Sequence, residues 1–157
     1  MDALQFTLNG QLIRHEGDAT ARLLDVLRDT YGCTSVKCGC CEGECGACSV
    51  LIDGVLANSC CVAVGAVDGH QVTTLEGYRD SARFAVLNKT FADVAAVQCG
   101  YCTPGMVLAA EALLAQNPHP SEDDIRLALS GNICRCTGYN AIVTAVQRAA
   151  QEGNGLW

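Results

Sequence analysis

Twelve cysteines are spread unevenly along this chain of 157 residues, and their spacing indicates what chemistry they could perform. Six of them fall in the nineteen residues 32–50, which read GCTSVKCGCCEGECGACSV. The spacing C-x4-C-x2-C, typical of the plant-type [2Fe–2S] loop, occurs there twice in overlapping registers. One register is Cys33, Cys38 and Cys41, and the other is Cys40, Cys45 and Cys48. Only one register can enclose a given cluster.

Glycine placement favours the second register. Between Cys33 and Cys38 the residues are TSVK, which include two β-branched side chains and no glycine, so a stiff backbone is expected there. The second register has glycines at positions 39, 43 and 46. Glycine reaches positive φ without steric cost and lets backbone N–H groups approach closely, which a loop around a negatively charged cluster needs.

A fourth ligand in this half has to be Cys60 or Cys61. We expect both residues on one strand with side chains on opposite faces, so that only one of them can serve. Zinc is the alternative occupant, because C-x2-C also suits a tetrahedral zinc ion. The three glycines and the four-residue gap favour the iron–sulfur cluster.

A second set of cysteines lies further along the chain. Cys99 and Cys102 are separated by two residues, Cys134 and Cys136 by one, and 31 residues lie between the pairs. Each pair precedes a predicted helix, where N–H groups and the helix dipole stabilise an anionic centre. The spacing predicts a four-thiolate site and leaves zinc open as its metal.

The remaining composition narrows the class of protein. The opening residues lack a signal-peptide pattern, and no apolar run is long enough for a membrane span. Cysteines that are adjacent or one residue apart favour a shared metal centre over disulfides, so we expect a cytoplasmic metal protein. The net charge is −7 and no basic stripe is present, which excludes nucleic-acid binding.

The first half is predicted to be a small sheet with one helix. Leu4, Phe6 and Leu8 alternate as in a half-buried strand, and residues 12–16 form a second strand after a turn. A helix follows, with Asp18 or Thr20 as N-cap, and stops at Gly32. Two apolar runs joined at residues 53–54 predict a hairpin, and residues 70–77 contain a last strand.

From about residue 78 the periodicity becomes helical. Four helices are expected: one in residues 82–97, one opened by Thr103 as N-cap, one opened by Ser121, and one over residues 139–151. Met106, Leu113 and Leu114 are predicted core of this bundle. The tail is expected to be disordered unless Trp157 docks on the fold.

Four segments together resemble a known family: GCCEGECGAC, NSC, QCGYCTPGM and GNICRCTGY. They are similar to the signature segments of the small iron–sulfur subunit of molybdenum hydroxylases, the family of xanthine dehydrogenase and aldehyde oxidoreductase. The resemblance implies an α+β protein, with an N-terminal β-grasp ferredoxin-like domain over residues 1–78 and a C-terminal four-helix-bundle domain over residues 79–157. Each domain would hold one [2Fe–2S] cluster.

The resemblance also implies ligands and neighbours. The ferredoxin-type cluster would take Cys40, Cys45, Cys48 and Cys60, and the helical one Cys99, Cys102, Cys134 and Cys136. Gln98 and Cys136 would approach a molybdopterin. Molybdenum with its pterin would lie on a large partner subunit and FAD on a medium one, in a complex that can be a dimer of heterotrimers.

Several residues are left over. Cys33, Cys38, Cys41 and Cys61 are expected to be small buried hydrophobic residues, with a ligand exchange at Cys40/Cys41 or Cys60/Cys61 as the alternative. His15, His70 and His119 stand alone and are not expected to bind metal. Arg135, between two predicted ligands, either tunes the cluster, reaches a partner or is a solvated loop residue.

The implied function is electron transfer. The chain would relay electrons from the molybdenum site to FAD and would not be catalytic alone, since no nucleotide loop or substrate pocket is indicated. A purine or another N-heteroaromatic compound is the expected substrate of the complex. The alternatives are the small subunit of an aldehyde or carbon monoxide dehydrogenase, a stand-alone ferredoxin-like carrier, and a zinc-stabilised interaction module.

Overall fold

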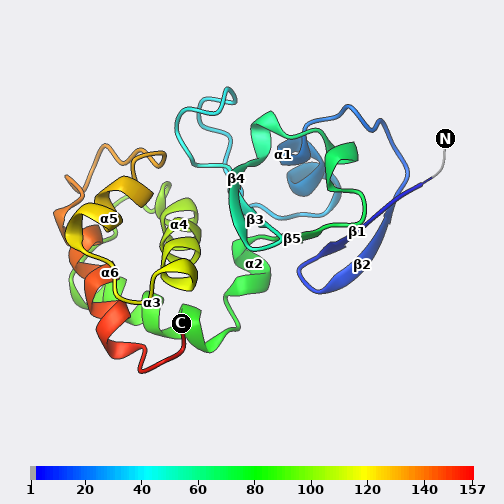
Figure 1. Ribbon diagram of the computed structural model, residues 1–157. Coiled ribbons are helices and arrows are strands. Elements are labelled where there is room, and N and C mark those ends of the chain that lie inside the picture. The colour runs from blue at the N-terminus through cyan, green and yellow to red at the C-terminus, as the bar shows by residue number, and fades with distance from the viewer. Residues whose placement is uncertain (1–2) are drawn as a thin grey trace.

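The computed structural model describes residues 3–157; Met1 and Asp2, the start of the predicted first domain, lie outside the described residues. The chain has an α+β fold that combines a five-stranded mixed sheet with several helices. Figure 1 shows the sheet and helix α1 at one side and helices α3 to α6 at the other, with α2 between them. Among the described residues, no helix is both long and apolar enough to cross a membrane.

The sheet has the strand order β2-β1-β5-β3-β4. β1 (Leu4–Leu8) pairs antiparallel with β2 (Gln11–His15), and β3 (Ser49–Ile52) pairs antiparallel with β4 (Val55–Asn58). β5 (Gln71–Thr73) joins the two hairpins, parallel to β1 and antiparallel to β3. The predicted hairpin at residues 53–54 is therefore confirmed, and a strand forms in each predicted segment, although the second strand of the hairpin ends at Asn58.

The first helix differs from its prediction. It consists of a short α1 (Leu23–Asp25) that continues as a π-helical turn over Val26–Thr30, and Gly32 follows with φ of +69°. Neither Asp18 nor Thr20 caps it, so that prediction is wrong. Asp18 instead accepts hydrogen bonds from the backbone and hydroxyl of Thr20 in the preceding turn. The N–H of Leu23 bonds to the carbonyl of Val62, a partner the local sequence could not indicate.

The helical half contains α2 (Leu75–Tyr78), α3 (Ala82–Asp93), α4 (Thr103–Gln116), α5 (Glu122–Ala128) and α6 (Asn140–Glu152). The four predicted helices are present, and α2 was not predicted. Ser121 forms the expected N-cap of α5, as part of a capping box with Asp124. Thr103 is not an N-cap, because Cys102 occupies that position and Thr103 is the first helical residue.

Two hydrophobic cores form. One lies between the sheet and α1 and includes Phe6, Leu23 and Leu27. The other lies among the later helices and includes Met106 and Leu114, both fully buried as predicted, with Leu113 partly buried at its edge.

A buried carboxylate in the helical core bonds to residues near the start and at the end of the helical half. Glu111 on α4 accepts hydrogen bonds from the Tyr78 hydroxyl at 2.5 Å, from Arg83 at 2.9 Å and from the indole Nε1 of Trp157 at 2.7 Å. Arg83 also supplies the opposite charge that a buried carboxylate requires. The tail was expected to be either disordered or docked through Trp157, and in the structure Trp157 is docked.

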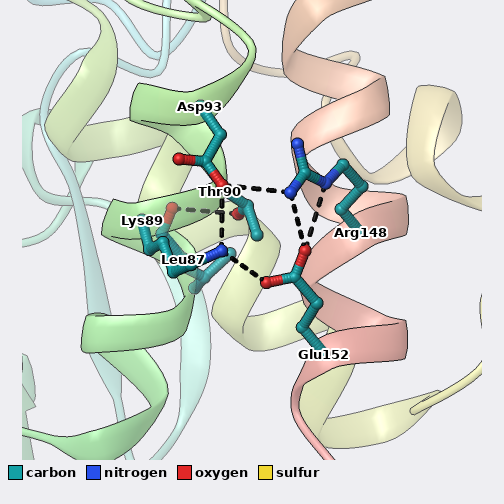
Figure 2. Close-up of polar contacts among 6 residues, drawn as sticks. All are labelled: Leu87, Lys89, Thr90, Asp93, Arg148 and Glu152. Carbon is teal, nitrogen blue, oxygen red and sulfur yellow. Dashed lines mark hydrogen bonds and ion pairs between the residues drawn. The ribbon is translucent and has the colours of Figure 1, made fainter.

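An ion-pair network joins the exposed sides of α3 and α6 (Figure 2). Lys89 contacts Asp93 at 2.9 Å and Glu152 at 2.8 Å, while Arg148 contacts the same two carboxylates at 3.0 and 2.8 Å. Each cation therefore bridges one residue of α3 and one of α6. Their positions in solvent make this network a modest contribution to stability.

Candidate iron–sulfur sites

The loop from Cys40 to Cys45 surrounds one sulfur with backbone donors. The N–H groups of Glu44 and Cys45 point to Sγ of Cys40 at 3.3 Å each, and that of Glu42 at 3.5 Å. The N–H of Cys40 in turn donates to Sγ of Cys45 at 3.4 Å. The hydrogen bonds from Glu42 and Cys45 lower the pKa of the Cys40 thiol to about 7. The loop thus favours a thiolate, the form that binds metal.

Glycines make this loop possible. A Cβ on Gly39 would lie 2.7 Å from Sγ of Cys45, and one on Gly43 would lie 2.9 Å from Sγ of Cys61. Gly43 and Gly46 also have φ of +85° and +66°, which L side chains rarely adopt. A side chain at position 39 or 43 would occupy space next to the sulfurs, which agrees with the predicted role of these glycines.

Two further sulfurs lie deeper in the same half. Cys48 and Cys60 are both buried. Burial raises the pKa of the Cys48 thiol to about 11. Ser59 fixes the turn that carries Cys60, because its hydroxyl donates to the carbonyl of Cys48 at 2.8 Å.

The expected arrangement of Cys60 and Cys61 is wrong. β4 ends at Asn58, and residues Ser59–Cys61 form a 3-10 turn instead of continuing the strand. In this turn the two side chains do not alternate across a sheet, and their sulfurs lie 3.7 Å apart. Cys60 is buried and Cys61 is exposed. The two residues therefore differ in their burial, and they do not lie on opposite faces of a strand as expected.

The four surplus cysteines are not all buried, contrary to expectation. Cys33 is buried in the core beside the sheet, whereas Cys61 is exposed. Cys38 and Cys41 form a disulfide, with Cα atoms 5.8 Å apart, so the expectation of no disulfide is also wrong. Cys41 adopts φ of +59° in the tight turn at Gly39 and Cys40, which brings the two residues within bonding range. The first register is thereby split between the core and the surface.

The second set gathers at the ends of α4 and α6. Sγ of Cys99 and Sγ of Cys136 lie 3.7 Å apart. Burial raises the pKa of the Cys134 thiol, but hydrogen bonds from Thr137 outweigh this effect and lower that pKa to about 7. The Thr137 hydroxyl donates to the Cys134 sulfur at 3.1 Å. Burial raises the pKa of Cys102 to about 12.

All four cysteines of the second set line one cavity of about 220 Å³. Cys45 of the first set lines it too, and Tyr101, Ile133 and Arg135 complete its rim. Its walls come from the cysteine-rich loop and from the two segments before α4 and α6. One cysteine of the first set therefore borders the same space as the whole second set.

Direct hydrogen bonds hold the two sets together. The N–H of Ile133 donates to the carbonyl of Cys45 at 2.9 Å, and the buried amide of Asn132 donates to the carbonyl of Gly46 at the same distance. The Tyr101 hydroxyl donates to the carbonyl of Cys38 at 2.8 Å. Residues adjacent to the ligands of one predicted site thus bond to the backbone of the other.

In the second set, the sulfurs of Cys99 and Cys136 approach each other, at 3.7 Å. Among residues 3–157, no group of three or more Cys, His, Asp or Glu side chains is arranged to hold a single metal ion. A [2Fe–2S] cluster needs two protein ligands for each of its two irons, so a set of four thiols fits its demands. The donor set, the N–H groups around Cys40 and the glycines beside the sulfurs all fit such a cluster.

The other candidate residues lie apart from the sulfurs. His15 bonds to the Tyr31 hydroxyl at 3.0 Å and His70 to Asp53 at 2.5 Å, which gives both rings structural partners. His119 and Gln98 are exposed, and Gln98 is the neighbour of Cys99. Arg135 is exposed on the rim of the cavity, in the position expected of a residue between two ligands.

Sequence reasoning missed Tyr139. Its hydroxyl accepts a hydrogen bond from the N–H of Cys134 at 2.8 Å and donates to the carbonyl of Asn132 at 3.3 Å, which closes the loop before α6. Its backbone has φ of +69°, unusual outside glycine and asparagine. The sequence signal that could have indicated this role is the presence of polar residues between Cys136 and α6, among them Thr137 and Tyr139.

Comparison with known proteins agrees with this geometry. Residues 74–147 match the family model described as a [2Fe-2S] binding domain. Over 149 residues the chain is 47% identical to the nicotinate dehydrogenase small FeS subunit of Eubacterium barkeri, covering 95% of each chain. The chain belongs to the family of small iron–sulfur subunits of molybdenum hydroxylases. Another relative in this family, the xanthine dehydrogenase iron-sulfur-binding subunit of Escherichia coli, is 40% identical, with 91% of each chain aligned.

Solved structures extend the similarity to three dimensions. Quinoline 2-oxidoreductase from Pseudomonas putida 86 contains a chain that matches with a TM-score of 0.90 and 37% identity, over 97% of this chain and 95% of that one. Aldehyde oxidoreductase from Desulfovibrio gigas matches with a TM-score of 0.92 and 41% identity over all of this chain, which corresponds to 18% of that longer chain. The small-subunit fold is therefore shared between separate subunits and one part of a larger polypeptide.

Proposed function

We propose that this chain is the electron-relay subunit of a molybdopterin-dependent hydroxylase and passes electrons from the molybdenum site through two [2Fe–2S] clusters to FAD. The observation that carries the proposal is the cavity lined by the whole second set and by Cys45 of the first set, with the hydrogen bond from Ile133 to Cys45 beside it. Two adjoining centres suit a relay, whereas a stand-alone carrier needs only one.

The proposed ligands follow the two sets. One cluster takes Cys40, Cys45, Cys48 and Cys60, and the other takes Cys99, Cys102, Cys134 and Cys136. When bound, each cluster supplies reversible one-electron exchange. The chain's own residues hold the thiolates in place: backbone N–H groups stabilise charge on Cys40, and the Thr137 hydroxyl does so on Cys134. Cys48 is buried at the first site and Cys134 at the second, which limits the access of water to these two sulfurs.

The domain organisation is part of the proposal. Residues 1–78 would form a β-grasp ferredoxin-like domain, and residues 79–157 a four-helix-bundle domain. The two separate hydrophobic cores support this division, as does the start of the family match near residue 74. Gln98 and Cys136 are both exposed beside the cavity, which supports the proposal that they face a molybdopterin on the partner subunit.

The partners and the substrate class are proposed from the relatives. We propose a large molybdopterin subunit and a medium FAD subunit, assembled as a dimer of heterotrimers in the cytoplasm. Names such as nicotinate dehydrogenase, nicotine 6-hydroxylase and quinoline 2-oxidoreductase support an N-heteroaromatic substrate. An aldehyde substrate is the second candidate, since aldehyde oxidoreductase shares this fold.

Metal analysis and EPR of the native complex test the proposal. We expect about four irons per copy of this chain and two distinct EPR signals after reduction, because two [2Fe–2S] clusters contribute two irons each. Molybdenum and flavin should co-elute with the chain on size exclusion. Stoichiometric zinc without an EPR signal would contradict it, and an iron-loaded monomer free of molybdenum and flavin would indicate a stand-alone carrier.

A further inference from the structure

The proposed ligand set leaves one thiol unexplained at the first site. Cys61 follows Cys60 in the 3-10 turn, and its sulfur lies 3.7 Å from that of Cys60. The other three surplus cysteines are engaged elsewhere. Cys33 is buried in the core, and Cys38 and Cys41 are bonded to each other. Cys61 is therefore the one surplus cysteine that is both free and exposed.

The sulfur of Cys61 points at the cluster loop. It lies 2.9 Å from the place that a Cβ on Gly43 would take, and Gly43 is in the middle of the loop from Cys40 to Cys45. The carbonyl of Gly43 is held by the amide of Asn58, at 2.8 Å, just before the turn that carries Cys61. The loop and the turn are thus fixed against each other with the Cys61 sulfur between them. A larger residue at position 43 would exclude that sulfur.

We propose that Cys60 and Cys61 form a two-thiol ligand position, in which either sulfur can complete the first cluster. The inference rests on the proposed function, since it assumes the other three ligands named there. With the cluster bound, exchange would replace the iron bond to the Cys60 sulfur by one to the Cys61 sulfur, and the Cys61 proton would pass to Cys60. No electron would be gained or lost. The two sulfurs lie 3.7 Å apart, so the incoming sulfur starts beside the one it would replace.

Substitutions in the intact complex test this inference. We expect Cys60→Ala and Cys61→Ala each to keep about four irons per chain, because the remaining thiol completes the cluster, and the double variant to keep about two. Cys60→Ala should shift the EPR g-values of the first cluster alone. Cys102→Ala is the matched control, because no surplus cysteine lines the second site, and it should lose half of the iron. Loss of half of the iron in either single variant would overturn the inference.

Labelling of the wild-type complex covers the case in which Cys60→Ala does not assemble. Brief treatment with iodoacetamide, followed by peptide mass spectrometry, should place the label on Cys60 in some chains and on Cys61 in others, never on both. Label on Cys61 alone would refute the exchange. A wild-type complex without iron would instead refute the proposed function, so the two failures remain distinguishable.

Discussion

In the cysteine-rich loop, the sulfur of Cys40 is surrounded by backbone N–H groups from residues within five positions of it, whereas in the helical half the sulfur of Cys134 receives a side-chain hydroxyl from Thr137. The proposed ligands of the first site come from one short loop and a nearby turn. Those proposed for the second come from segments 31 residues apart that precede α4 and α6. The first site therefore depends on local backbone conformation and the second on helix packing.

The two sites nevertheless share an electrostatic pattern. Each combines one thiol whose pKa is lowered to about 7 by hydrogen bonds, Cys40 or Cys134, with a thiol whose pKa is raised by burial, Cys48 or Cys102. Two unrelated backbones thus each provide one thiol whose pKa is lowered and one whose pKa is raised. Substitutions at each site can show how independent the two sites are.

Ligand removal should have the largest effect. We expect Cys45→Ala to abolish the EPR signal of the first cluster and Cys134→Ala that of the second, each with loss of about half of the iron, because a three-thiolate site does not retain the cluster. Iron analysis and EPR of the two complexes measure this. Loss of both signals from one substitution would show that the sites do not assemble independently.

The junction between the two sites should be the next most sensitive point. Gly46→Ala places a side chain at φ of +66° against the carbonyl of Gly131 and the amide of Asn132, so we expect destabilisation of about 2–5 kcal/mol from backbone strain and overpacking together. Gly54→Ala is the control, since φ there is +81° but nothing lies within 4 Å, and about 1–2 kcal/mol is expected. Urea unfolding measures the free energy of unfolding of both variants. Equal destabilisation by the two substitutions would contradict a packed junction.

A carboxylate on α2 should give a smaller, pH-dependent effect. Glu76 accepts hydrogen bonds from the N–H and hydroxyl of Ser35, at 2.8 and 2.6 Å, and from the hydroxyl of Thr74 at 2.6 Å. Burial raises the pKa of this carboxyl, but the hydrogen bonds outweigh burial and lower it below 4.5. Its stabilisation is therefore present above the pKa of the unfolded chain and is lost as the pH falls through the folded-state pKa.

We accordingly expect Glu76→Gln to cost about 1 kcal/mol at pH 7, since the site is half-exposed, and progressively less below pH 4.5. Thermal unfolding at pH 7 and pH 4 measures the difference. A cost that does not change with pH would mean that the charge of Glu76 contributes nothing.

The ion-pair network of Figure 2 should matter least. Arg148→Met removes the contacts to Asp93 and Glu152, all at the surface, so we expect only a small fall in the melting temperature that disappears at 1 M salt, where screening is nearly complete. Lys89→Met is the matched variant, with contacts to the same two carboxylates. A large fall in the melting temperature of either variant would mean that the helical half depends on these ion pairs more than on its hydrophobic core.

The sequence predicted well wherever the signal was local. The alternation of Leu4, Phe6 and Leu8 predicted the first strand, and Ser121 with the acidic residues after it predicted the start of α5. The glycines at 39, 43 and 46 indicated which loop approaches the sulfurs, because positive φ and close contacts can be expected of glycine alone.

Prediction failed where a tertiary contact replaced a local one. The N-terminus of α1 is satisfied by Val62, so the polar residues before it were poor guides. The chain leaves the strand at Asn58 because the Ser59 hydroxyl and N–H bond to the carbonyl of Cys48, which placed the Cys60 and Cys61 sulfurs side by side. Nor could spacing reveal the contact of Asn132 with Gly46, since it joins residues 86 positions apart.

Trp157, docked on Glu111, gives the chain a built-in optical reporter. It is the single tryptophan of the sequence, and its indole packs over Gly153 at the end of α6 while donating to a carboxylate in the helical core. Its fluorescence emission should therefore respond to loosening of the helical half and ignore local changes in the cysteine-rich loop. An emission shift can thus follow assembly of one half of the protein in real time, without any label.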